Sequence, residues 1–244
     1  MSDNLEGRVA IVTGAASGLG AAVWERLNLD GVRVLPVDLQ GEGCLHADAA
    51  TEAGNHLIID TAIKRFGRMD ALVLNAGVQF VAPIPDFPVD QWDRLMNVMV
   101  KGPFLATKYA WPYLTERPGG RIVVTASTSS VTAEANKCAY VAAKHAVTGL
   151  IKVAALEGGP LGLTANAVAP GWMRTGMVEG QLEDQMRIRR LPRQETIDAM
   201  LDRQPVKRFL ETSEVANVIA FLVSEHAGGI NGTCIPVDLG TLAC

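Results

Sequence analysis

A short apolar run that ends in glycine and continues directly into a helix constrains the fold of this chain most. Residues 8–13 form an apolar strand pattern that ends in TGAASGLG, residues 17–30 have a helical pattern, and residues 32–37 form a second apolar strand. Two strands joined through one helix in this way run parallel. The amino terminus therefore predicts a βαβ unit.

The same alternation of strands and helices continues along most of the chain. Only residues 175–209 depart from it, because they are charged, rich in arginine and helical in pattern, and we expect a lid there. No repeat or Pro/Gly linker divides residues 1–244, which predicts one doubly wound, Rossmann-type α/β domain with a parallel sheet of about seven strands. Further strands are expected at 44–47, 70–75, 121–126, 163–168 and 233–237, and helices at 51–66, 89–114, 138–156 and 213–223.

Composition excludes several classes of partner. The 244 residues are 48% hydrophobic and carry a formal net charge of −4, without a basic stripe, so neither nucleic acid nor an anionic membrane is an expected partner. No apolar run approaches the roughly 18 residues that span a bilayer. The four cysteines have no metal-ligand spacing and suggest no disulfide framework, which predicts a reducing cytoplasm.

Tyr140 and Lys144 form a candidate proton-transfer centre. They are four residues apart in a helical pattern, so they share one face of the helix. Lowering a phenol pKa from about 10 by two to three units takes roughly 3 to 4 kcal/mol, and a neighbouring ammonium in a partly dry pocket supplies energy of that order. The spacing also occurs by chance on many helices. Ser127, thirteen residues upstream, and the glycine pattern favour the functional interpretation.

The glycines predict a dinucleotide site. Gly14, Gly18 and Gly20 open a helix, where backbone N–H groups approach a pyrophosphate closely. Asp38 follows the second strand, eighteen residues after Gly20, and its carboxylate can accept hydrogen bonds from both ribose hydroxyls and repel a 2′-phosphate. NAD is therefore expected rather than NADP. The alternative for the glycines is an ordinary strand-to-helix turn, and the alternative for Asp38 is a solvated strand end.

Together these residues resemble the classical short-chain dehydrogenase/reductase family over about residues 7–240. TGAASGLG is similar to its cofactor loop, LNAG at 74–77 to its Asn-Asn-Ala-Gly turn, and APG at 169–171 to the segment that holds the nicotinamide carboxamide, while Asp48 resembles an adenine-contacting acid. The cofactor residues implied by this resemblance are Gly14, Ser17, Gly18, Leu19, Gly20, Asp38, Asp48, Ala49, Asn75, Ala76, Gly77, Tyr140, Lys144, Pro170, Gly171, Met173 and Thr175.

The resemblance also implies four catalytic residues, Asn97, Ser127, Tyr140 and Lys144. As a secondary alcohol is oxidised, its proton must leave while hydride passes to the nicotinamide. Tyr140 is the expected base, and Ser127 orients the substrate oxygen. Lys144 lowers the phenol pKa and reaches the ribose, while Asn97 holds a water that relays protons.

A closer likeness, in NAGVQF, EANKCAYVAAKH and PGWMRT, is to the D-3-hydroxybutyrate dehydrogenase branch, which grips a carboxylate with two Gln, one Lys and one His. Gln79, Lys137 and Gln181 match three of these donors, and Ser129 replaces the imidazole. Thr241 stands where the branch has a Trp, which predicts a larger pocket. The expected substrate is an anionic small molecule, a 3-hydroxy acid such as 3-hydroxybutyrate or a bulkier analogue. Its predicted contacts are Gln79, Ser127, Lys137, Tyr140, Trp172 and Gln181.

Several alternatives stay open at this stage. A bulkier neutral secondary alcohol or ketone is a second substrate class, and a non-catalytic NAD(H)-binding redox sensor is a second functional class. A serine hydrolase lacks its G-x-S-x-G motif, and no histidine pair has metal-ligand spacing, so no metal is expected. The family resemblance implies a homo-oligomer, a tetramer.

Overall fold

The protein is described here by a computed structural model covering residues 5–243, so Cys244 lies outside the described residues. Seven strands form one sheet in the order β3-β2-β1-β4-β5-β6-β7, and every neighbouring pair is parallel. The predicted doubly wound parallel sheet is therefore confirmed. The strands are β1 (Val9–Thr13), β2 (Arg33–Asp38), β3 (Leu45–His46), β4 (Ala71–Leu74), β5 (Arg121–Thr125), β6 (Thr164–Pro170) and β7 (Cys234–Val237).

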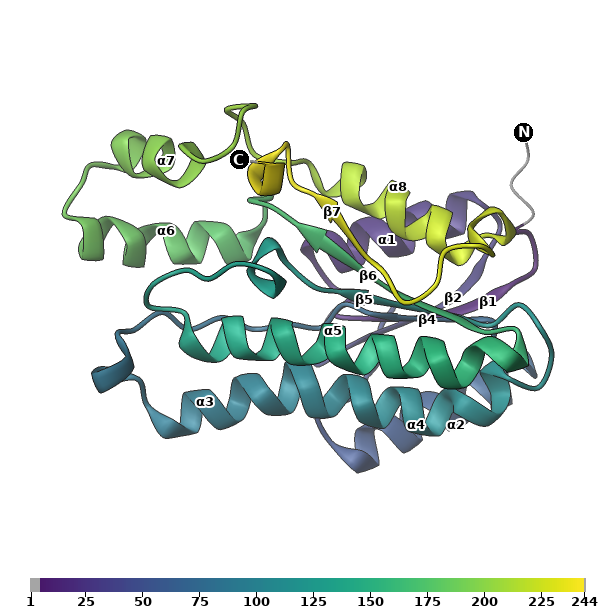
Figure 1. Cartoon of the computed structure of the whole chain (residues 1–244). Coiled ribbons are helices and arrows are strands. Elements are labelled where there is room, and N and C mark those ends of the chain that lie inside the picture. The colour runs from purple at the N-terminus through teal and green to yellow at the C-terminus, as the bar shows by residue number, and fades with distance from the viewer. Residues whose placement is uncertain (1–4, 244) are drawn as a thin grey trace.

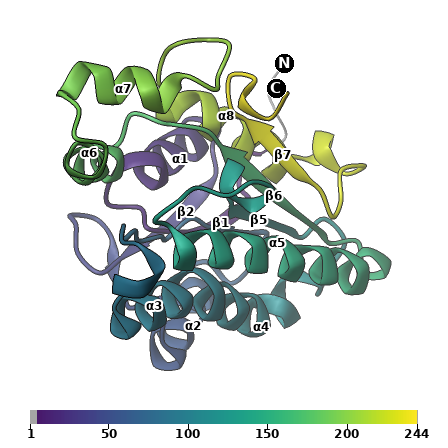
Figure 2. The same ribbon diagram turned by 60° about the vertical axis from the view of Figure 1, so that its left-hand side comes forward.

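Helices cover both faces of the sheet, as Figures 1 and 2 show. Helices α1 and α8 lie on one face, and α2, α4 and α5 lie on the other. The helices are α1 (Gly18–Leu29), α2 (Glu52–Phe66), α3 (Val89–Met96), α4 (Gly102–Leu114), α5 (Cys138–Gly158), α6 (Gly176–Arg189), α7 (Arg193–Leu201) and α8 (Thr212–Val223). The short helices are η1 (Ile84–Asp86), η2 (Asn97–Lys101, a π-helix), η3 (Thr128–Ser130), η4 (Gly159–Leu161), η5 (Glu225–Ala227) and η6 (Thr241–Ala243).

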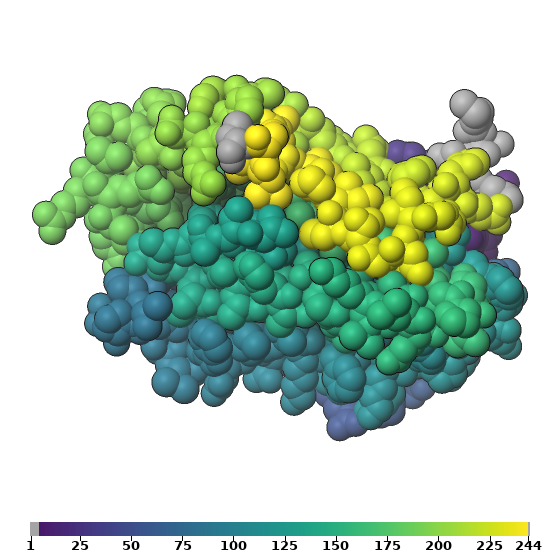
Figure 3. All heavy atoms as spheres, in the orientation of Figure 1, coloured from purple at the N-terminus to yellow at the C-terminus, as the bar shows by residue number. Residues whose placement is uncertain are grey.

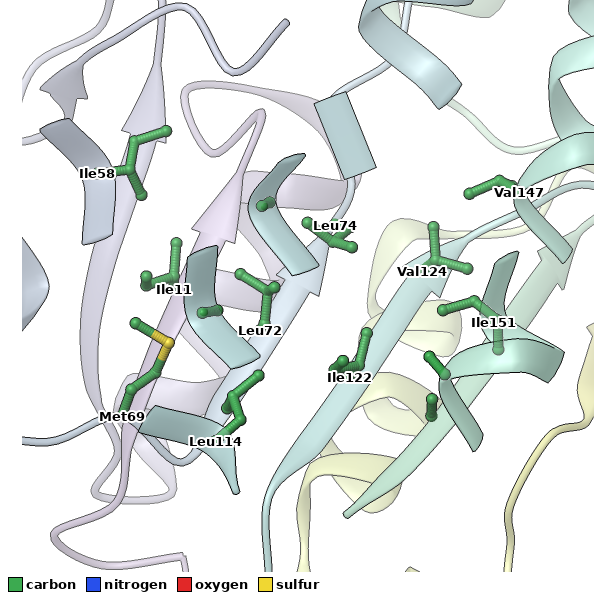
Figure 4. Close-up of a cluster of buried hydrophobic side chains, with 14 of the residues drawn as sticks. Ile11, Ile58, Met69, Leu72, Leu74, Leu114, Ile122, Val124, Val147 and Ile151 are labelled. Carbon is green, nitrogen blue, oxygen red and sulfur yellow. The ribbon is translucent and has the colours of Figure 1, made fainter. Parts of the chain in front are cut away.

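Two apolar cores hold these layers together. Figure 4 shows the core beneath α2, α4 and α5, in which Ile11, Leu72 and Ile122 of the sheet pack against helical side chains such as Ile58 and Ile151. Each fully buried side chain of this size contributes about 1.5 to 3 kcal/mol. Every residue of β1 is buried, as expected for a strand covered by helices on both faces. The cores thus fix the strand ends on which the site is built.

The loop after β1 passes very close to helix α1. Gly14 has a φ of +69°, a left-handed conformation that favours glycine. A Cβ added to Gly20 would lie 1.9 Å from the carbonyl oxygen of Gly14, so no larger residue fits without moving this loop. The predicted glycine pattern therefore serves helix–strand packing at Gly20 and a tight turn at Gly14.

The segment predicted as a lid forms α6 and α7. Thr175 caps α6 by accepting a hydrogen bond from the Val178 N–H at 3.4 Å. The two helices stand at one end of the molecule, beyond the sheet, and in Figure 3 they form the green lobe above the teal segments. Their position places residues 175–201 beside the carboxyl ends of the strands.

The expectation that no segment is long and apolar enough for a bilayer is wrong. Residues Cys138–Leu161, which include α5, pass that test by length and composition. The inner side of α5 packs in the core through Val147, Ile151 and Ala154, and the buried Lys144 lies on the same helix. A helix in the core of a folded domain passes the same test, so this finding is weak evidence for a membrane span.

Candidate active site

A cavity of about 480 Å³ opens at the carboxyl ends of six strands, β1 to β6. The strand order reverses between β1 and β4, and ligands of open parallel sheets bind at such a point. The cavity is lined by the predicted residues Gly14, Ser17, Gly18, Leu19, Asp38, Asp48, Ala49, Asn75, Ala76, Gly77, Gln79, Ser127, Lys137, Tyr140, Lys144, Pro170, Gly171, Trp172, Met173, Thr175 and Gln181. The structure therefore brings most of the predicted site residues together around one cavity.

Two predicted residues are not part of the cavity lining. Gly20 lies beneath it, against Gly14. Asn97 is exposed at the start of the π-helical turn η2, and Met99, only 2% exposed, is the residue of this turn that packs with Ala139 and Ala143 of α5. Asn97 therefore lies outside the cavity that the other three catalytic candidates line, and its part in a proton relay stays a prediction.

Ser127, Tyr140 and Lys144, which we call the catalytic group, lie together. A side-chain hydrogen bond joins Tyr140 and Ser127. The Ser127 Oγ also accepts a hydrogen bond from the Ser129 N–H at 3.1 Å, which fixes the serine at the start of η3. Protein atoms surround the Tyr140 ring, but part of its surface faces the open cavity. A substrate oxygen entering the cavity can therefore reach both hydroxyl groups.

The ionisation of the catalytic group differs from the sequence-based expectation. Burial raises the pKa of Tyr140 to about 12; its hydrogen bond with Ser127 lowers the pKa, and the negative charge of Glu134 raises it further. Burial also lowers the pKa of Lys144 to about 8. The Lys144 Nζ donates a hydrogen bond to the Thr125 carbonyl at 2.6 Å and lies 5.5 Å from the centre of the Tyr140 ring. Without a bound ligand, the pKa of Tyr140 is therefore raised and not lowered, because burial has the larger effect.

The residues predicted to hold a dinucleotide suit that ligand. Helix α1 begins after Ser17, whose side chain does not cap it, so the first N–H groups of the helix are available for a phosphate. The Asp38 Oδ2 accepts a hydrogen bond from the Ala16 N–H at 3.0 Å, and its Oδ1 accepts one from the Leu39 N–H at 2.7 Å. These bonds orient the carboxylate at the cavity and leave further lone pairs for ribose hydroxyls.

Asn75 supports the site by joining three strands. Its Nδ2 donates to the carbonyl oxygens of Thr13 and Gly14, at 3.1 and 3.2 Å, and its Oδ1 accepts a hydrogen bond from the Thr125 hydroxyl at 3.1 Å. The side chain thus fixes the glycine loop against β4 and β5. The structure places this residue at the predicted site, but its amide is already committed to the protein.

A polar cluster, which we call the Lys137 cluster, lines the same cavity and consists of Ser129, Glu134, Lys137, Trp172 and Gln181. The Lys137 side chain is only 3% exposed, and its Nζ lies 2.9 Å from the Glu134 Oε2 and 4.3 Å from the centre of the Trp172 ring. The Ser129 hydroxyl donates to the Glu134 Oε1 at 3.3 Å. Sequence reasoning found four of the five residues and missed Glu134.

Within residues 5–243, no group of three or more His, Cys, Asp or Glu side chains could hold a metal ion.

Comparison with known proteins decides the family. A family model described as Enoyl-(Acyl carrier protein) reductase matches residues 14–241, which include the glycine loop and the catalytic group. The chain belongs to the short-chain dehydrogenase/reductase family. It is similar to an uncharacterized oxidoreductase of Bacillus subtilis (38% identity; 97% of this chain and 98% of the relative covered) and to a D-beta-hydroxybutyrate dehydrogenase of Rhizobium meliloti (35%; 97% and 99%).

A solved structure agrees with this assignment. The ligand-free aldohexose dehydrogenase of Thermoplasma acidophilum superposes with a TM-score of 0.92 at 32% identity, covering 99% of this chain and 96% of that chain. The relatives of this short-chain dehydrogenase/reductase are named dehydrogenases and reductases. The protein is therefore an oxidoreductase that acts on CH–OH groups.

Proposed function

We propose that this protein transfers hydride between a secondary alcohol and NAD, with residues 1–244 acting as one NAD-binding unit. The observation that carries the proposal is the placement of Ser127, Tyr140 and Lys144 in the cavity that Gly14, Gly18 and Asp38 also line. The bound cofactor would supply the hydride acceptor or donor at its nicotinamide ring.

The catalytic group would manage the proton of the alcohol. Ser127 holds the substrate oxygen, and Tyr140 takes the hydroxyl proton during oxidation or gives it back during ketone reduction. While Lys144 is protonated, its positive charge favours the phenolate form of Tyr140. Without ligand the pKa of Tyr140 is about 12 and that of Lys144 about 8. Protonated Tyr140 suits ketone reduction, and for alcohol oxidation the proposal requires the bound cofactor and substrate to lower the pKa of Tyr140.

The choice of NAD over NADP is supported by Asp38. Its carboxylate lines the cavity and would repel the 2′-phosphate of NADP.

Two substrate classes have specific support. A 3-hydroxy acid such as 3-hydroxybutyrate is supported by Gln79, Lys137 and Gln181, which line the cavity with the catalytic group, and by the likeness to D-beta-hydroxybutyrate dehydrogenase. A neutral secondary alcohol or ketone is supported by Glu134, whose carboxylate already pairs with Lys137. The geometry favours the neutral class, because a substrate carboxylate would have to compete with Glu134.

The proposed function is tested by NADH formation from secondary alcohols and 3-hydroxy acids, with Tyr140→Phe as the matched variant. We expect turnover by the wild type only, while both proteins bind NAD in calorimetric titrations. Binding of NAD by both proteins without turnover of any alcohol or reduction of any ketone would instead identify a redox sensor.

Assembly and location are proposed from the family resemblance. We propose a homotetramer in the cytoplasm. The three cysteines within residues 5–243, Cys44, Cys138 and Cys234, are unpaired, which is compatible with a reducing compartment.

A further inference from the structure

The Lys137 cluster contains one carboxylate, that of Glu134. It forms an ion pair with Lys137, and both side chains line the cavity that contains Tyr140 and Ser127. Its charge acts on the catalytic phenol, because Glu134 is one cause of the raised pKa of Tyr140. Glu134 is therefore a residue of the active-site cavity and not a surface partner of the lysine.

The ion pair changes what Lys137 can bind. The buried Lys137 ammonium alone would attract an anion, but the Glu134 carboxylate, at hydrogen-bond distance, neutralises its charge. The Glu134 side chain remains 33% exposed. The charge of Arg189 also acts on Lys137, but that side chain is exposed and bonded to Gln185, so solvent screens it. A substrate carboxylate in this position would meet a like charge.

A free hydrogen-bond acceptor in the Lys137 cluster also disfavours a substrate carboxylate. The Gln181 side chain is only 7% exposed, and its Oε1 is buried without a hydrogen-bond partner. Its Nε2 donates to the Met177 carbonyl at 3.3 Å, and this bond fixes which end of the amide carries the free acceptor. An unsatisfied buried acceptor costs about 1 to 3 kcal/mol, and a ligand that donates a hydrogen bond would remove that cost. A carboxylate has no proton to donate, whereas a hydroxyl group has one.

We infer that Glu134 makes this cavity selective for a neutral diol or polyol, or the corresponding hydroxyketone, whose second hydroxyl group binds at the Lys137 cluster. That hydroxyl donates a hydrogen bond to Glu134 or to the Gln181 Oε1 and accepts one from Lys137, while the reacting carbinol lies at Tyr140 and Ser127. The inference rests on the proposed function and adds a specificity-determining residue to it.

Three four-carbon alcohols test this inference, since they differ only in the group that would meet the cluster. 1,3-Butanediol carries a hydroxyl group where 3-hydroxybutyrate carries a carboxylate, and 2-butanol carries neither. We expect the wild type to oxidise 1,3-butanediol with a kcat/KM at least about tenfold above the values for the other two, the scale of one added hydrogen bond to a charged group. The highest value for 3-hydroxybutyrate would overturn the inference.

Variants of Glu134 separate charge from shape. Glu134→Gln should lower the ratio of kcat/KM for 1,3-butanediol to that for 2-butanol by about tenfold and raise the ratio for 3-hydroxybutyrate to 2-butanol by about tenfold. Dividing by the 2-butanol value cancels the effect of the lost charge on Tyr140, which is common to all three alcohols. Glu134→Asp, which keeps the charge, should retain the preference for the diol. Glu116→Gln, on the exposed surface outside the cavity, is the matched control and should change none of the three values. Thermal melting curves of all variants report whether they fold.

Binding distinguishes a failure of this inference from a failure of the proposed function. If no variant oxidises any alcohol, the proposed function fails, and titration of 3-hydroxybutyrate and 1,3-butanediol into the protein with NAD still measures the preference. An acid-to-diol affinity ratio that rises in Glu134→Gln supports the role of Glu134. An unchanged ratio, in turnover or in binding, overturns it.

Discussion

Replacing Lys144 by methionine should change the free energy of unfolding in a pH-dependent way. Relative to the wild type, Lys144→Met should be more stable at neutral pH than at high pH. Burial lowers the pKa of Lys144 from 10.5 to about 8 in the folded protein. At pH 7 the lysine is charged in both states, and this difference corresponds to a cost of about 3 kcal/mol in the folded state. Methionine has a similar length and no charge, so Lys144→Met removes the cost.

The pH dependence separates this effect from other losses in the variant. Lys144→Met also loses the hydrogen bond to the Thr125 carbonyl, and that loss reduces the gain by about 1 to 3 kcal/mol at every pH. At pH values between about 8 and 10.5, the unfolded wild type binds more protons at Lys144 than the folded wild type does. The free energy of unfolding of the wild type therefore increases as the pH rises through this range. From pH 7 to pH 10 the stability of the wild type should therefore rise by roughly 2 to 3 kcal/mol relative to Lys144→Met.

The assay is equilibrium unfolding in urea at pH values from 7 to 10, without NAD, for both proteins. Tyrosines and cysteines titrate in both proteins and cancel in the difference. Lys64→Met, at an exposed position on α2, is the control and should run parallel to the wild type. If the free energy of unfolding of Lys144→Met also follows that of the wild type from pH 7 to pH 10, burial does not lower the pKa of Lys144 in the folded protein.

Two further changes test the cofactor and relay assignments. Asp38→Ala should raise the ratio of kcat/KM with NADP to that with NAD by about tenfold or more, because a like-charge contact of even 1.4 kcal/mol corresponds to tenfold; an unchanged ratio would remove Asp38 from cofactor selection. Asn97→Ala tests the relay: because Asn97 is exposed and outside the cavity lining, kcat should stay within about twofold of the wild type, whereas a hundredfold loss would support a relay through Asn97.

The sequence predicted the fold well because its signals are local. The apolar runs of β1 and β2 and the glycines between them identify parallel strands without knowledge of distant contacts. Gly14 and Gly20 are required by backbone geometry, which is why their pattern could be recognised. Lys137 could also be placed, because it lies one helical turn before Tyr140.

The features that the sequence could not show depend on three-dimensional surroundings. The π-helical turn at Asn97–Lys101 alters which side chains face α5, so the order of residues along the chain could not show that Met99 faces inward and Asn97 outward. The direction of the Tyr140 pKa depends on burial, which no spacing reveals. Glu134 had one available signal: an acid three residues before Lys137 is within reach of an ion pair.

Isotope transfer tests the central claim most directly. The best substrate of the alcohol panel, labelled with deuterium at the carbinol carbon, is incubated with NAD, and the reduced cofactor is analysed by mass spectrometry. If the catalytic group acts as proposed, the wild type should form NADH carrying one deuterium, while Tyr140→Phe binds NAD and forms none. Equal deuterium transfer by Tyr140→Phe, or NADH without the label, would contradict direct hydride transfer assisted by Tyr140.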